Sequence, residues 1–536
     1  AVNWAENVMP QTKYYVTDSR ITLPGKADLI APTAKVFAGW YDTDGNLVTE
    51  IPAGSTGDKT FYAQWVEEKN EFVFVDDEHV LATVPDNIEY TPGTTDTPTP
   101  EDGICANSDD VFLYWYYLDG TTEMPMAYAT ISNMMKGRVE LYPKVISTTI
   151  KTAGDLKALA IRYAYKTLEG SYTFKLEDTL YLNEEQPAIG TSSRPFDQTF
   201  DGNSQTIVMS GTSRPLFCYV GETGTVKNLT ISLDDVTAST VQVDLMGTKY
   251  WGAVAVENSG TIENCNVFGT ILSVTTDTYT YLGGIVGFNN SSGTVKNCRA
   301  GLDDANKLTI GNGRKTVTSS AGGLIGRNYG PVTLEAGLTH NVVLNGDFYC
   351  AGGLIAASDS KSVTITGNTI NSSVLTFGTG NCGGLIGSVA SGGPLTIANC
   401  TITSKVRGFV GDMGGLIGVF KGTNLSVTGN TITVDEISQE NGDLGRLTGG
   451  LIGRVDQKNT TVTVKNNAKI TVTIVHTDVV REEHYYAGLI AYIAGSKSVI
   501  DVSENKNVTV KISGKKLIDK YNIGGMIGAL CGEQTL

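Results

Sequence analysis

The residues of this chain that could carry out chemistry are its cysteines, its histidines and a few pairs of adjacent carboxylates. The 8 cysteines include no CxxC pair, and none of the 4 histidines is followed by another after three residues, so the spacing of a zinc site is absent. Residues 481–486, REEHYY, lack the second histidine of a helical zinc-hydrolase motif. We therefore predict no metal site, no cofactor and no catalytic residues.

Four pairs of acidic residues could in principle cleave glycans, because glycoside hydrolysis requires two carboxylates on either side of one bond. The pairs are Asp234 and Asp235, Asp303 and Asp304, Asp435 and Glu436, and Glu482 and Glu483. They do not recur at a constant interval, and the segment LDDANK (302–307) lacks the ligand spacing of a calcium loop. We expect all of them to be solvated turns and the chain not to be an enzyme.

A repeated glycine phrase is the most regular feature of the sequence, and we expect it to set the positions of the surface residues. Its copies are variants of GGLIG that begin at Gly283, Gly322, Gly352, Gly383, Gly414, Gly449, Ala487 and Gly524. Successive copies are 39, 30, 31, 31, 35, 38 and 37 residues apart, and WGAVAV at Trp251 is a divergent copy. Repeats of this length, made of short β-branched runs and turn residues, are typical of single coils of a β-solenoid. We expect about ten coils, each with about three strands.

A second phrase, a β-branched run that ends in asparagine, follows the glycine phrase in most coils. Its asparagines are Asn228, Asn264, Asn297, Asn368, Asn399, Asn430, Asn466 and Asn505. Equivalent residues of adjacent coils stack about 4.8 Å apart. Asparagine tolerates the left-handed backbone of a sharp corner, and stacked amides bond to one another. We therefore predict that these residues form one structural column at a corner.

Two features of the repeats leave alternatives open. The adjacent Leu and Ile of the glycine phrase either both point inward at a bend, which we expect, or one of them forms an exposed apolar stripe that could serve as a contact surface. Cys265 and Cys298 occupy equivalent places in adjacent coils, within the Cα distance of a disulfide. We favour two small buried side chains.

The chain before the repeats predicts two small β-rich modules, at 1–69 and 70–145. In the first, FAGWYDTDGNLV (37–48) has two strand-like runs around an Asp-Gly turn, and FLYWYYLDGTTEM (112–124) is its counterpart in the second. The Trp and Tyr residues of these runs could stack on carbohydrate. We expect them instead to form the core, because such small modules have little else to bury.

The segment between the modules and the repeats predicts the only helix. Residues 152–170 carry apolar side chains at helical spacing, with Thr152 as N-cap and Asp155 three residues later. The end of a solenoid exposes strand edges and needs a cap. We assign 146–170 to this cap and 171–536 to the solenoid, and we expect the natural chain to continue beyond Leu536.

Composition excludes several classes of partner. Gly accounts for 62 of 536 residues, and charged residues for 18%. The net charge of −16 argues against a nucleic-acid partner and against binding to anionic lipid. No apolar run reaches the ~18 residues of a membrane-spanning helix.

These phrases resemble known families. GGLIG followed by runs such as TIANC is similar to the GLUG motif of bacterial surface proteins, and FAGWYDTDGN with KTFYAQW resembles the internalin-type B-repeat (Listeria–Bacteroides repeat). The second module departs from that pattern, with LYWYY in place of FAGWY. The resemblance implies β-grasp-like modules, a right-handed parallel β-helix and a secreted or wall-attached protein. GLUG coils also flank IgA-specific metallopeptidases.

Our leading hypothesis is a non-enzymatic, extracellular bacterial protein, an adhesin or stalk that presents a β-helical surface. Its partner would be a glycan or protein of a host or a neighbouring cell. One alternative is the accessory region of a giant secreted protease or glycan-active enzyme. The other is a self-associating subunit of a filament or surface layer, since strand edges at a solenoid end favour stacking.

Overall fold

The structure, a computed structural model, describes most of the chain. The described residues are 3–4, 20–31, 35–67, 70–90, 100–125, 137–182, 186–238, 241–242, 248–272, 280–313, 319–378, 380–408, 411–439, 447–476, 484–494, 497–514, 521–531 and 534–535. They belong to two compact units, one made of Ala1–Ser108 and Tyr114–Val145, the other of Asp109–Leu113 and Ile146–Leu536.

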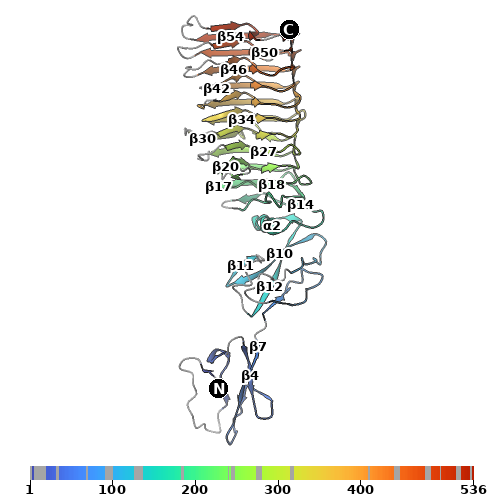
Figure 1. The fold of residues 1–536 in the computed structure, drawn as a ribbon, viewed down its shortest axis with the longest axis vertical. Helices are drawn as coiled ribbons and strands as arrows, with labels where there is room; N and C mark the ends of the chain where they lie inside the picture. The colour runs from blue at the N-terminus through green and yellow to red at the C-terminus, as the bar shows by residue number, and fades with distance from the viewer. Residues whose placement is uncertain are drawn as a thin grey trace. The chain divides into compact units, whose positions relative to one another are not determined.

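The second unit is a parallel β-solenoid, which confirms the predicted fold class (Figure 1). Four parallel sheets run along it, and a typical coil adds one strand to each. We number the four sheets by their first and last strands.

Sheet 1 runs from β13 (Thr149–Ile150) to β57 (Gln534–Thr535), and sheet 2 from β15 (Leu180–Leu182) to β54 (Val508–Gly514). The parallel part of sheet 3 runs from β22 (Lys249–Gly252) to β55 (Tyr521–Gly524), and sheet 4 from β18 (Phe217–Val220) to β56 (Ile527–Leu530). Sheet 4 has 10 strands, in agreement with about ten coils.

A representative coil contains four strands, so the expectation of three strands per coil is wrong. The glycine phrase bends the chain at Gly384 and Leu385 and divides one apolar run into two strands that belong to different sheets. The strands of this coil are β39 (Asn381–Gly383) in sheet 3, β40 (Ile386–Val389) in sheet 4, β41 (Leu395–Ala398) in sheet 1 and β42 (Thr401–Gly408) in sheet 2.

Coil length varies mainly at the corner between sheets 2 and 3. The strands β38 (Thr369–Thr376) and β39 are separated by residues 377–380, whereas β46 (Thr431–Gln439) and β47 (Leu447–Gly449) are separated by 440–446. Insertions between strands leave the stacked strands in place, because connections tolerate changes of length better than the elements that they join. This explains why the spacing of the glycine phrases is uneven although the phrases stack.

The predicted helix is α2 (Ala153–Tyr165), and it lies beside the first coils, as a cap requires (Figure 1). Thr152 Oγ1 accepts from Asp155 N at 3.2 Å, and Asp155 Oδ2 accepts from Thr152 N at 2.8 Å, which is the predicted capping box. The ring of Tyr163 is fully buried, 5.6 Å from Phe196 of the solenoid, and its hydroxyl donates to Asp197. Among the described residues, no helix is long and apolar enough to cross a membrane.

The chain before the solenoid forms small sheets. Trp40 and Trp115 are buried within them, which confirms the core role expected for these two tryptophans. The domain boundaries and the β-grasp-like assignment stay predictions. One antiparallel sheet contains β5 (Leu47–Val48), β4 (Lys35–Tyr41) and β7 (Tyr62–Glu67), and a mixed sheet contains β11 (Thr122–Pro125), β10 (Asp110–Asp119), β12 (Arg138–Ser147), β8 (Glu71–Phe74) and β9 (Ile88–Glu89).

Candidate binding surface

Part of the predicted asparagine column lies at the corner between sheets 1 and 2. Five members have left-handed backbone, with φ between 50° and 56°, and their side chains are exposed or half-buried. They are Asn228, Asn264, Asn297, Asn399 and Asn466. Across two adjacent coils, Asn264 Nδ2 donates to Asn228 Oδ1 at 3.3 Å. The prediction of a corner column is confirmed for these five residues.

The prediction is wrong for Asn368, Asn430 and Asn505, which lie one position further along their coils. Strand pairing aligns Asn368 with Cys400 rather than with Asn399. Glycine adopts the left-handed conformation at least as readily as asparagine, so in the phrase TGN the glycine takes the corner. The left-handed residues at this corner in the three coils are Gly367, Gly429 and Glu504.

The displaced asparagines belong to an inner column that faces the interior of the solenoid. Asn430 Oδ1 accepts from Cys400 N at 2.8 Å, while its Nδ2 donates to Ile397 O at 2.9 Å and to Asn467 Oδ1 at 3.0 Å. Asn467 Nδ2 then donates to Asn505 Oδ1 at 2.8 Å. Each amide joins main-chain groups of one coil to a side chain of the next, which stabilises the register of the stack.

A second inner column was missed by sequence reasoning. Asn258 Nδ2 donates to Asn289 Oδ1 at 2.8 Å, and Asn289 Nδ2 donates to Asn328 Oδ1 at 2.8 Å. Asn328 Nδ2 continues to Ser358 Oγ at 3.2 Å, and all four side chains are buried. A signal was present, because each of these residues lies six positions after the first glycine of its phrase.

The first positions of the glycine phrases stack in register along sheet 3, as predicted. Both apolar residues of the phrase are buried in every copy except the last, where Met526 is exposed, so the inward arrangement is confirmed for the stacked copies; Leu385 and Ile386 have no exposed surface. The bend between them and the preceding strand allows two neighbours in sequence to face one interior. The stacked residues are Gly252, Gly283, Gly322, Gly352, Gly383, Gly414, Gly449, Ala487 and Gly524.

The cysteines in the inner column are buried thiols. Cys265 and Cys298 are aligned in adjacent coils, have no exposed surface and are not bonded to each other. Their Sγ atoms lie 3.7 Å from Val226 O and 3.6 Å from Ile262 O, which are equivalent to the carbonyls that inner-column amides contact elsewhere. Burial raises the pKa of the Cys265 thiol. The favoured interpretation, two small buried side chains, is confirmed.

The acidic pairs are not brought together. Asp303 accepts from Asn306 within its own turn, and Glu436 pairs with Arg407 at 2.8 Å. Asp234 and Asp235 are exposed on β20 (Thr230–Ala238). The pair Glu482 and Glu483 lies outside the described residues. Within the described part of the chain, no group of three or more His, Cys, Asp or Glu residues could hold a metal ion.

One histidine is buried in the solenoid, where burial disfavours its charged form. His340 has no exposed surface, its Nδ1 accepts from Ala300 N at 3.4 Å, and its Nε2 has no hydrogen-bond partner among the described residues. Burial, with a smaller contribution from the charge of Arg299, lowers the pKa of His340 from 6.5 to about 3. Only the unfolded chain therefore takes up this proton as the pH falls from 6.5 toward 3.

We predict that this histidine lowers stability by about 2 kcal/mol between pH 6.5 and 4.5, because the unfolded imidazole is half protonated at pH 6.5 and each pH unit well below that value costs about 1.4 kcal/mol. His340→Asn keeps an acceptor for Ala300 N and removes the titration, so its free energy of unfolding should fall less over this range. Urea unfolding at several pH values measures the slope. The exposed His79 provides the control variant, His79→Asn, and equal slopes for the wild type and His340→Asn would contradict the prediction.

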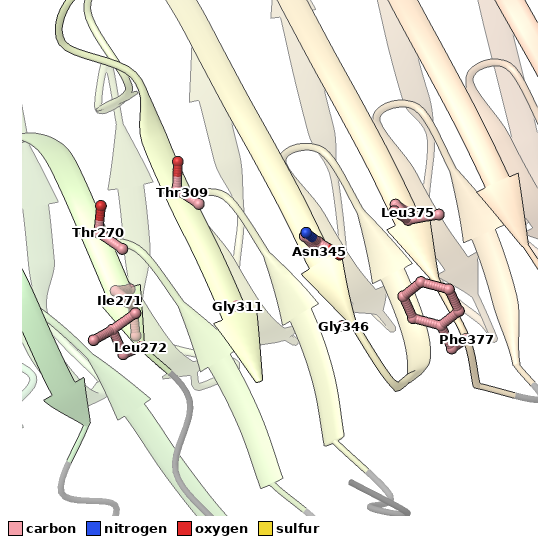
Figure 2. A pocket seen from close by; sticks show the side chains of 9 residues that line it. All are labelled: Thr270, Ile271, Leu272, Thr309, Gly311, Asn345, Gly346, Leu375 and Phe377. Carbon is pink, nitrogen blue, oxygen red and sulfur yellow. The ribbon is translucent and has the colours of Figure 1, made fainter. Parts of the chain in front are cut away.

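A groove of about 460 Å³ lies on the outer face of sheet 2 (Figure 2). Ile271 and Ile310 are paired across two adjacent strands, and Gly311 is the residue that follows Ile310. Because glycine has no side chain to fill the outer face at this position, the surface is hollowed there. The groove crosses β25 (Asn266–Leu272), β30 (Leu308–Gly313), β34 (Thr339–Gly346) and β38. Its lining residues are Thr270, Ile271, Leu272, Thr309, Gly311, Asn345, Gly346, Leu375 and Phe377.

The groove combines apolar and hydrogen-bonding groups. Leu272 is 47% exposed, and Phe377 is half-buried at the other side of the hollow. Thr270 and Thr309 are paired across adjacent strands, and their hydroxyls project from the sheet on the same side (Figure 2). Such a surface can hold a ligand that has both apolar faces and hydroxyl or amide groups. Sequence reasoning missed it because its residues come from four coils and do not recur as a phrase.

The fold and this surface together define a parallel β-solenoid protein with an open groove on one sheet. No protein-family model and no curated protein matches the chain. Among solved structures, the chain is similar to one described as a "putative immunoglobulin A1 protease from Bacteroides ovatus", with 16% identity and a TM-score of 0.32 over 62% of this chain and 83% of that one. At that identity and TM-score the likeness carries no argument about function.

Proposed function

We propose that this chain belongs to a non-enzymatic, extracellular protein of a bacterial surface, an adhesin or stalk whose solenoid presents a binding face. The observation that carries the proposal is the groove on the outer face of sheet 2. The groove lies on parallel strands whose four coils are joined internally by the buried column of Asn258, Asn289, Asn328 and Ser358, so its lining residues are held in place. A preorganised surface of this kind lowers the entropic cost of binding.

The resemblance of the repeats to GLUG motifs and of the front modules to B-repeats supports the extracellular and bacterial parts of the proposal. The ligand would be a glycan or a protein of a host or a neighbouring cell. A mixed lining of leucine, phenylalanine, threonine and asparagine suits both, because sugars and extended peptides also combine apolar faces with hydrogen-bonding groups.

We predict that Gly311→Leu reduces binding at least about tenfold. The new side chain would occupy the groove, and a few central contacts usually supply most of the binding energy of a contact surface. A Cβ at position 311 would lie 3.5 Å from Asn345 O, which is an ordinary contact, so the new side chain fills the groove without displacing the backbone. The purified chain is first screened on a glycan array and a panel of host matrix proteins, and each hit is then titrated with the variant.

The matched control is Thr403→Leu, which adds leucine to a half-buried outer position of β42 away from the groove. It should bind like the wild type. A hit that Gly311→Leu leaves unchanged would assign binding to another face. The absence of any specific hit would contradict the adhesin proposal and favour a spacer.

A further inference from the structure

A second surface lies where the outer faces of sheets 3 and 4 meet at the glycine bend. The bend is sharp because a third glycine packs against sheet 3 of the preceding coil: a Cβ at Gly287 would lie 2.9 Å from Tyr250 Cβ, and one at Gly326 would lie 2.9 Å from Tyr281 Cβ. The outer side chains of β22 and β26 (Thr280–Gly283) therefore lie against those of β27 (Val286–Asn289) and β32 (Ile325–Asn328).

Aromatic rings and one arginine gather in this crease. Tyr250 stacks on Tyr281, with ring centroids 5.4 Å apart, and on Phe288 at 5.2 Å. Tyr329 meets Phe288 edge to face at 5.3 Å. The Arg327 guanidinium lies over Tyr281 and Tyr329 and donates to both hydroxyls, at 2.8 and 3.0 Å. We call these five residues the arginine–aromatic cluster.

The cluster continues into a hollow of about 240 Å³ at the start of sheet 4. Strand pairing places Tyr219, Glu257, Phe288 and Arg327 in one outer column, one residue per coil. The first two line the hollow together with Ser259. The hollow and the cluster thus form one continuous strip, with an aromatic ring and a charged group alternating along the solenoid axis.

The chemistry of this strip suits a neutral, polyhydroxylated ligand. The half-buried ring of Tyr219 can accept the C–H face of a sugar ring, because aromatic faces carry partial negative charge. Phe288 is stacked on Tyr250 and is only half-buried, so it adds apolar contact surface beside that position. Glu257 accepts hydrogen bonds and Arg327 donates them, so the strip can both accept from and donate to the hydroxyl groups of a sugar. The Arg327 charge is balanced by Asp359 at 2.8 Å, and the net charge of −16 disfavours acidic polymers.

We propose that the strip from Tyr219 to Arg327 is a binding site for a neutral glycan chain, with one sugar unit in the hollow and the following units on the arginine–aromatic cluster. The hollow is smaller than the ~300 Å³ of ordinary small-molecule sites, which matches one sugar unit rather than a whole ligand. The site is separate from the groove on sheet 2.

The test is affinity electrophoresis of the full chain in gels that contain neutral mannan, galactomannan or xyloglucan, compared with cationic chitosan and anionic polygalacturonate. We expect retardation by at least one neutral polymer, unchanged in 0.5 M salt because no net charge is neutralised. Phe288→Ala should weaken that retardation at least about tenfold. Retardation by the charged polymers alone, or by none, would overturn the proposal.

Phe268→Ala is the matched control, because Phe268 is a half-buried outer phenylalanine on β25 of sheet 2 that contributes to neither site. It should bind like the wild type. Glu257→Gln provides a second test if Phe288→Ala does not fold; it removes a charge at the surface and should also weaken binding. Gly311→Leu should leave this binding unchanged, so failure here is distinguishable from failure of the groove on sheet 2.

Discussion

Gly384→Ala is expected to destabilise the solenoid by at least about 3 kcal/mol, the upper part of the range for overpacked interiors. A Cβ at this position would lie 2.1 Å from Gly415 O of the next coil and 2.6 Å from Ser404 Cβ. Both obstacles are backbone or directly attached to it, so neither can rotate away. Relief would require the coils to separate, which would break sheet hydrogen bonds. Urea unfolding monitored by circular dichroism measures the loss.

Gly311→Ala is the matched control, since Gly311 also lies in the solenoid and its nearest neighbours to an added Cβ are 3.5 and 3.9 Å away. Its stability should stay within about 1 kcal/mol of the wild type. A Gly384→Ala protein as stable as Gly311→Ala would show that the bend relaxes easily. The glycine phrase would then reflect something other than close approach of successive coils.

Asn430→Ala is expected to lower the free energy of unfolding by about 3–5 kcal/mol. The substitution leaves the buried Cys400 N–H and Ile397 carbonyl without their side-chain partners, and each orphaned group costs about 1–3 kcal/mol. It also removes a bond to Asn467, so the inner column is interrupted. The shift of the urea midpoint at constant m-value measures the effect.

Asn399→Ala tests whether a corner asparagine contributes less to stability than an asparagine of the inner column. Asn399 belongs to the same kind of phrase, but its side chain is exposed and its backbone is left-handed, with φ of 55°. Alanine there should cost only about 1–2 kcal/mol, for the unfavourable backbone conformation. Equal losses for the two variants would refute the distinction between the columns.

Much of the fold follows from the period of the sequence. A glycine phrase returns about every 30–39 residues, with β-branched runs between the copies. This pattern predicts stacked coils rather than one compact core, because in a stack each residue packs against the equivalent residue of the next coil and the same residue types must therefore recur. Local signals also suffice where the interactions are local. Thr152 and Asp155 specify the start of α2 within four residues, and the left-handed corner at Asn264 needs no partner from another coil.

Other features were decided by the tertiary structure. The bend at Gly384 assigns one apolar run to two sheets, and it exists because the coil above approaches closely. Whether an asparagine such as Asn368 points outward or inward depends on which neighbour occupies the left-handed corner, and glycine and asparagine are near-equivalent there.

The repeat pattern of the sequence predicts neither of the two candidate binding sites. The groove at Gly311 and the strip at Arg327 are built from outer side chains of successive coils, which lie about 30 to 40 residues apart in sequence and a few ångströms apart in the stack. Inner positions repeat because they must pack against their equivalents. Outer positions are free of that constraint, so their residue types vary, and only the stacking of the coils brings them together.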